Sequence, residues 1–179
     1  IDGCPVALES VLKLSFMSII SFIHTLFSVL ALLSGAYVFF NFKGTDRHIL
    51  AGRIYAISML ALLFTSFFIF DLFGRFGVFH ALTIVSLVTL GLGMYFPLFA
   101  RRHPSWLAHH YMWMSYSYVG LVMAAGSHLF GVVPGWPSWL RITLFWVLPY
   151  VIGSALIFRN RKGILQEVRE RTGLDFTIR

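Results

Sequence analysis

Long apolar stretches alternate with short polar breaks along most of the chain. Each stretch has close to the 20 or so residues that an α-helix needs to cross a bilayer, and most charged residues lie in the breaks or after the last stretch. The pattern predicts an all-α, polytopic membrane protein with five transmembrane helices, of which four form a four-helix bundle core. The predicted spans are residues 12–42, 49–73, 77–100, 106–130 and 140–158.

The composition indicates a membrane domain rather than a soluble one. The 179 residues are 58% hydrophobic and 12% charged, whereas a soluble domain carries about twice that charged fraction. The mean hydropathy is +0.80. A single cysteine, Cys4, excludes an internal disulfide bond. Because the first apolar stretch is longer than the core of a signal peptide, we expect it to be a true span.

The net charge of +7 is distributed unevenly across the predicted membrane. In a five-span arrangement only Lys13, Arg75 and Arg141, of the 14 Lys and Arg residues, lie on one side. The positive-inside rule therefore predicts an N-terminus outside and a basic cytoplasmic tail over residues 159–179, in part a short helix. Topology and attraction to anionic lipid explain the basic excess, and no nucleic-acid partner is expected.

Four histidines lie one on each of the first four predicted spans. Ionisable side chains are costly inside a bilayer and by default indicate a functional site. At about 1.5 Å per residue, His24 and His80 lie roughly 27–30 Å from the cytoplasmic ends of their spans, whereas His48 and His110 lie close to those ends. The sequence therefore predicts two levels of histidine, separated by roughly 20 Å or more.

The order of these histidines suits two stacked haems. In a sequential antiparallel bundle the first and third helices are diagonal neighbours, as are the second and fourth. A haem with two axial histidines across a bundle core requires that geometry. We expect His24 and His80 to bind an outer haem b. We expect His48 and His110 to bind an inner one. Either haem would be non-covalent, because the chain has no Cys-x-x-Cys-His motif.

Small and polar residues accompany His48 at helical spacing. Gly52 and Tyr55 follow it on the same helical face. Small residues beside a histidine leave room for a macrocycle, although they also permit close helix packing in membranes. Arg53 could reach a haem propionate or a lipid headgroup, and Tyr55 could hydrogen-bond a ligand or belong to an aromatic belt. We include Arg53 and Tyr55 in the predicted cofactor-binding set.

His128 adds an alternative at the outer level. It lies about five turns after His110 on the same helical face, near the level of His24 and His80. Three imidazoles at one level could bind copper or zinc, since neutral imidazole suits both metals. His128 could instead line a haem propionate or a quinone pocket.

Each histidine also has a simpler interpretation. His24 could hydrogen-bond a neighbouring backbone carbonyl, and His80 could be an interfacial residue. His48 could be solvated or contact a lipid phosphate. His109 lies beside His110, so either could face inward, and the face shared with His128 favours His110.

Several of these residues also form a family resemblance. The stretch Lys43-Gly44-Thr45 followed by His48, Gly52-Arg53, Tyr55 and Met59 resembles the loop-and-helix signature of bacterial membrane proteins catalogued as domain of unknown function 2306. His24, Phe79-His80-Ala81-Leu82, and His110 with Met114, Ser115, Tyr116 and Gly120-Leu121 resemble features of its first, third and fourth spans. The likeness covers residues 22–125 and implies a polytopic helical protein of the bacterial inner membrane. The family name implies no activity.

Two functional hypotheses follow. The first is a cytochrome b-like haem protein for transmembrane electron transfer, with a quinone or a redox protein as partner. The second is a non-catalytic integral subunit or assembly partner of a larger membrane complex, whose histidines bind copper or zinc or act structurally. Motifs of phosphate-binding, metalloprotease and hydrolase enzymes are lacking, so any enzymatic role would be that of a membrane oxidoreductase component. A channel or carrier is disfavoured because paired intramembrane carboxylates are missing.

Overall fold

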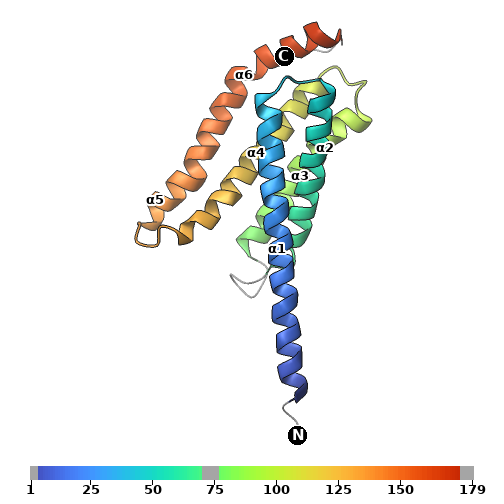
Figure 1. Ribbon diagram of the computed structural model, residues 1–179. Helices are drawn as coiled ribbons and strands as arrows, with labels where there is room; N and C mark the ends of the chain where they lie inside the picture. The colour runs from blue at the N-terminus through green and yellow to red at the C-terminus, as the bar shows by residue number, and fades with distance from the viewer. Residues whose placement is uncertain (1–3, 70–76, 174–179) are drawn as a thin grey trace.

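The computed structural model describes residues 4–69 and 77–173, and within these ranges it contains helices and turns but no strand. Figure 1 shows the helices side by side, with α1 extending beyond the others at its N-terminal end. The elements are α1 (Cys4–Phe40), α2 (Asp46–Ser66), α3 (Val78–Phe99), α4 (Trp106–His128), the 3₁₀ turn η1 (Leu129–Gly131), α5 (Ser138–Ile142), the π-helical turn η2 (Thr143–Val147) and α6 (Leu148–Thr172).

The first four helices form the bundle, and the last span packs on its outside. α1 packs along α2, α3 along α4, and the ring is closed by contacts of α2 with α3 and of α1 with α4. α1 and α3 therefore lie on one diagonal, and α2 and α4 on the other, as the sequential arrangement predicts. α6 packs against α4 (Figure 1).

Within the described residues, four segments are long and apolar enough to cross a bilayer: Ser15–Phe40, Asp46–Ser66, His80–Phe99 and Ser138–Thr172. The remaining long helix of the bundle, α4, has 23 residues, but its histidine, serine and tyrosine side chains make it less apolar than these four segments. It packs between α3 and α6, and its Ser115 and Ser117 are buried. The bundle thus shields the polar residues of α4 from lipid, and the predicted all-α polytopic class is confirmed.

The core lies where the four bundle helices meet. Its members include Ala31 of α1, Met59 of α2, Leu90 of α3 and Leu121 of α4. A Cβ atom on Gly35 would lie 2.4 Å from the ring of Tyr118, so only glycine admits that ring between α1 and α4. Large apolar side chains elsewhere on these helices are exposed, as expected for a surface covered by lipid.

α2 begins three residues before the predicted span. Thr45 caps it by accepting a 3.2 Å hydrogen bond from the His48 backbone N–H, and Gly44 supplies the positive φ of 79° that the preceding turn needs. His48 consequently lies within the first turn of α2. The helix ends at Ser66, and residues 70–73 of the predicted span lie outside the described part of the chain.

The last span runs without interruption into the tail. α5, η2 and α6 follow one another from Ser138 to Thr172, whereas the sequence predicts a span that ends at residue 158 and a separate short helix. The π-helical turn η2 precedes Pro149, which has no N–H to donate to the carbonyl four residues earlier. The helix continues past the charged residues because Leu165 and Val168 are buried on one face, and it ends before Gly173, whose φ is 63°.

Candidate functional site

His48 and His110 both lie near one end of the bundle, which we call the inner end and which carries the turn of residues 41–45. His48 comes from the first turn of α2 and His110 from the second turn of α4, the two diagonal helices. The two imidazoles are close enough to interact electrostatically. Nδ1 of His48 is buried and has no hydrogen-bond partner among the described residues.

A backbone carbonyl determines the tautomer of His110. Its Nδ1 lies 2.7 Å from the carbonyl oxygen of Gly93 on α3. Because a carbonyl only accepts, Nδ1 must carry the proton, and Nε2 keeps a free lone pair. Histidines that bind metal ions usually have this arrangement, in which the second nitrogen donates to a carbonyl or a carboxylate.

His109 faces a different environment from its neighbour His110. Its ring stacks on Phe96, with centroids 4.7 Å apart and planes 18° apart. Its Nδ1 donates a 2.8 Å hydrogen bond to the Ser105 carbonyl oxygen. His109 thus contacts Phe96 and the start of its own helix, whereas His110 bonds to the Gly93 carbonyl of α3.

The other two residues predicted at this site have different surroundings. Gly52 lies one turn after His48, and a Cβ atom there would meet nothing within 4 Å. Arg53 is exposed and makes no hydrogen bond or ion pair with any described residue. Tyr55 is buried, and its hydroxyl lies 2.9 Å from Ser117 Oγ on α4. Open space and a free cation thus lie near His48, while Tyr55 joins α2 to α4 deeper in the bundle.

At the other level, His24 is held by α2. Its Nδ1 lies 3.1 Å from Thr65 Oγ1. The Thr65 hydroxyl donates to the carbonyl oxygens of Ala61 and Leu62, at 3.0 and 2.9 Å, so it accepts from His24 Nδ1–H. Nε2 of His24 therefore keeps its lone pair. His128 lies within electrostatic range of His24, where two protonated imidazoles would repel each other.

His80 has a different hydrogen-bond pattern. It is 5% exposed, and its Nδ1 accepts a 3.3 Å hydrogen bond from the Gly77 N–H at the start of α3. Its ring lies 6.5 Å from that of Phe67, measured between centroids. A neutral imidazole that accepts at Nδ1 carries its proton at Nε2. Binding iron through Nε2 would require His80 to change tautomer and give up the Gly77 contact.

The outer level shows no complete metal site within the described residues. No group of three or more His, Cys, Asp or Glu side chains there is arranged to bind a metal ion. His128 is exposed at the end of α4. The predicted pairing of His24 with His80, and the three-imidazole copper or zinc site that includes His128, both stay predictions.

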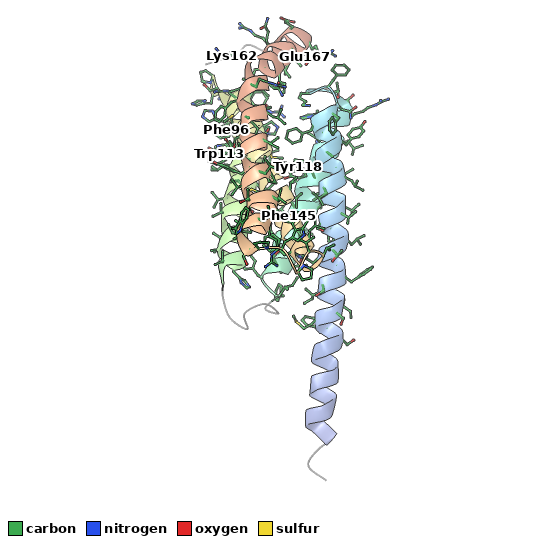
Figure 2. The ribbon with its side chains drawn as sticks, turned by 90° about the vertical axis from the view of Figure 1, so that its left-hand side faces the viewer. Phe96, Trp113, Tyr118, Phe145, Lys162 and Glu167 are labelled. Carbon is green, nitrogen blue, oxygen red and sulfur yellow. The ribbon has the colours of Figure 1, made fainter. Side chains whose placement is uncertain are left out.

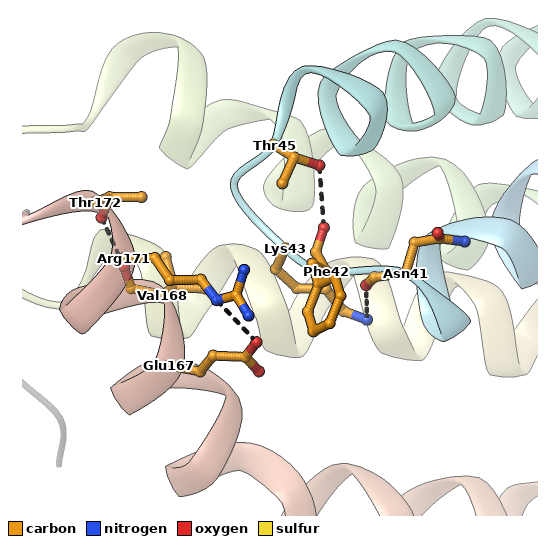
Figure 3. A network of polar contacts seen from close by, with 8 residues as sticks. All are labelled: Asn41, Phe42, Lys43, Thr45, Glu167, Val168, Arg171 and Thr172. Carbon is orange, nitrogen blue, oxygen red and sulfur yellow. Dashed lines mark hydrogen bonds and ion pairs between the residues drawn. The ribbon is translucent and has the colours of Figure 1, made fainter.

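The C-terminal part of α6, residues 159–172, covers the inner end. Leu165 packs with Ala108 of α4, and the Arg171 guanidinium lies 4.2 Å from the centroid of the Phe42 ring. Arg171 also pairs with Glu167 at 3.2 Å (Figure 3). Figure 2 shows Glu167 at this end of the molecule, far from Phe145 of the last span.

Lys43 adds positive charge beside the inner histidines. Its Nζ donates to the carbonyl oxygens of Phe39 and Asn41, at 2.6 and 2.8 Å, and it interacts electrostatically with His48. Burial lowers the pKa of Lys43, and the Glu167 carboxylate partly offsets this shift. The ammonium group is held in place by two carbonyl oxygens, within electrostatic range of His48.

These features define a polytopic helical membrane protein with histidines at two levels of its bundle. The chain matches the family described as predicted membrane protein (DUF2306) over residues 21–158. It belongs to that family, and the matched region contains all seven histidines. No curated protein and no solved structure matches the chain. The family and the apolar helices together place the protein in a lipid bilayer.

Proposed function

We propose that this protein binds haem b and transfers electrons across the membrane, with His48 and His110 as the axial ligands at the inner end. The observation that carries the proposal is the His110 tautomer, because the Gly93 carbonyl leaves Nε2 free to bind a metal. When bound, a haem supplies one-electron redox chemistry. The donor set supports the proposal: a second imidazole, His48, lies on the diagonal helix within electrostatic range of His110, and its Nδ1 is buried without a hydrogen-bond partner among the described residues.

The residues around this pair have supporting roles in the proposal. Gly93 orients the His110 ring, and Gly52 leaves open space one turn from His48. Lys43 and Arg53 supply the cations that haem propionates require, at the end of the bundle where His48 lies. Tyr55 is a positioning residue, since its hydrogen bond to Ser117 ties together the two helices that carry the ligands.

The outer level is proposed as the second redox site, with His24 as one ligand. Thr65 leaves Nε2 of His24 free in the same way that Gly93 does for His110. The second ligand is His80, as the order of the spans predicts, or His128, which lies within electrostatic range of His24. In this proposal the protein lies in a bacterial inner membrane, with its N-terminus outside and its C-terminus in the cytoplasm. A quinone or a redox protein exchanges electrons with it at each side.

Absorption spectra test the inner site. Protein expressed with a haem precursor and purified in mild detergent is expected to show a Soret band, a dithionite-reduced α-band and stoichiometric iron. His110→Ala should lose the inner haem, whereas His109→Ala, its matched neighbour, should retain it. A wild-type protein without a Soret band, or equal spectra for the two variants, would contradict the proposal.

Three further variants test the outer site. His24→Ala should remove the second haem and leave the inner one in place. His80→Ala and His128→Ala should then differ, and the variant that reproduces the His24→Ala spectrum identifies the second ligand. If all three variants keep the wild-type spectrum, the outer redox site is wrong.

A second candidate function has its own supporting observation. His24 and His128 lie within electrostatic range of each other, and imidazole is a ligand that suits copper and zinc. In this alternative the protein is a non-catalytic integral subunit or assembly partner of a larger membrane complex. Stoichiometric copper or zinc without iron, lost in His128→Ala, together with a firmly co-purifying partner, would select it over the haem proposal.

A further inference from the structure

A groove runs along the outer surface of the bundle between α1 and α2. It has a volume of about 470 Å³. On the α1 side it is lined by Leu30, Leu33 and Tyr37, among others, which recur at the three- and four-residue spacing of one helical face. Leu33 is 66% exposed. This wall is apolar and open to the membrane.

The α2 wall of the groove ends in a charge. Arg47, Leu50 and Ile54 line it, again at helical spacing. Leu50 and Ile54 are 61% and 43% exposed. Arg47 lies in the first turn of α2, at the inner end, so the groove is apolar along its length and cationic at its mouth.

A second hollow of about 420 Å³ adjoins the first at Arg47. Its lining combines the apolar ring of Phe42 with the polar side chains of Asn41 and Asp46, among others. Arg47 and Asp46 are neighbours in sequence and do not face each other on a helix. Neither makes an ion pair with any residue in the described ranges. The Asn41 amide nitrogen donates to the Tyr37 carbonyl oxygen at 2.9 Å, which leaves its amide oxygen as a free acceptor.

We propose that the two hollows together bind one zwitterionic phospholipid with a primary ammonium headgroup, of the phosphatidylethanolamine type. The acyl chains lie in the apolar groove between α1 and α2. Arg47 binds the phosphate through charge-assisted hydrogen bonds. The ammonium group donates to the Asp46 carboxylate and the Asn41 amide oxygen. Arg47 and Asp46 carry opposite charges, and neither is paired with a described residue. This arrangement favours a zwitterionic headgroup, because an anionic headgroup would place a second negative charge beside Asp46.

The expected selectivity follows from the headgroup chemistry. A choline headgroup has no N–H to donate to Asp46 or Asn41, and a glycerol headgroup has no positive charge. Losing a hydrogen bond between charged groups lowers affinity by roughly tenfold. The site should therefore prefer the ethanolamine lipid to choline and glycerol lipids with identical chains by roughly that factor.

Native mass spectrometry of the delipidated, detergent-purified protein tests this, with the three lipids titrated separately. Asp46→Asn should reduce the preference for the ethanolamine lipid, because only neutral amide oxygens then remain to accept from its ammonium group, and it should weaken choline-lipid binding less. Arg47→Gln should weaken all three lipids about tenfold, and Arg47→Lys should restore part of the loss. Glu170→Gln and Arg102→Gln, which change the same charges outside the groove, should bind as the wild type does.

Three results would overturn the proposal. The first is a wild-type protein that binds the three lipids equally or prefers the glycerol lipid. The second is an Asp46→Asn variant, folded by size-exclusion chromatography, that keeps the wild-type ethanolamine preference. The third is an equal loss in the two control variants, which would indicate diffuse charge. Soluble phosphoethanolamine, which lacks acyl chains, should not displace the lipid, and displacement would also count against the apolar groove. None of these measurements depends on haem.

Discussion

Several polar side chains inside the bundle bond to a different helix from their own. His24 of α1 bonds to Thr65 of α2, and His110 of α4 bonds to the Gly93 carbonyl of α3. Tyr55 reaches Ser117 across the diagonal. Within a membrane an unsatisfied polar group is costly, so these bonds fix the rotation of each helix about its own axis.

The Tyr55–Ser117 pair provides a direct measurement of such a bond. Tyr55→Phe and Ser117→Ala are each expected to lower the free energy of unfolding by about 1 kcal/mol. The double variant should lose less than the sum of the two, by about 0.6 kcal/mol, the average for hydrogen bonds between membrane helices. Unfolding in mixed detergent–SDS micelles measures the cycle, with Tyr150→Phe at a lipid-exposed position as control. Strict additivity would show that the bond contributes nothing.

At the scale of the helices, the contact between α1 and α4 depends on Gly35. A methyl group there would lie 2.4 Å from the Tyr118 ring. The hydroxyl of that ring donates to the Leu32 carbonyl oxygen at 3.2 Å, so the ring cannot withdraw without losing the bond. Gly35→Ala is therefore expected to destabilise the bundle by about 1–3 kcal/mol.

Gly120 of α4 is the matched control for Gly35. A Cβ atom at Gly120 meets nothing within 4 Å, so Gly120→Ala should be neutral or should stabilise the helix by up to about 1 kcal/mol. The same unfolding assay compares the two variants. Equal effects would mean that the α1–α4 contact is looser than the structure has it.

The limits of sequence prediction are clearest for the helices and their histidines. Hydrophobic periodicity and span order were sufficient to predict the all-α bundle and its diagonals, while the pairing of His48 with His110 stays a prediction. They did not predict that α2 begins at Asp46, because the Thr45 cap is polar and lies outside the apolar run. They also did not predict the Gly93 carbonyl as a partner, since every residue has a carbonyl and helix rotation decides which one is reachable. The Thr65 hydroxyl could have been found as a polar group at the level of His24.

For the whole molecule, the distribution of positive charge predicts the orientation in the membrane. The turn of residues 41–45 and residues 159–172 of α6 meet at the inner end, so their cations share one side. A fluorescent protein fused after the C-terminus is expected to fluoresce, and alkaline phosphatase fused there is expected to be inactive, because both report a cytoplasmic position. The opposite result would reverse the proposed orientation and exchange the two levels of histidine.

The π-helical turn η2 has a consequence for the register of the last span. Such a turn holds one residue more than a regular helix, and the surplus residue bulges out while the flanking faces keep their direction. Deleting one residue within 143–147 should therefore be tolerated, because a straight α-helix results. Deleting one residue between Ile152 and Ile157 should rotate the rest of the helix by about 100°. Leu165 would then lose its packing contact with Ala108 of α4. Protease digestion of residues 159–172 measures the difference: the deletion between Ile152 and Ile157 should make this segment easier to cleave, and the deletion within 143–147 should not.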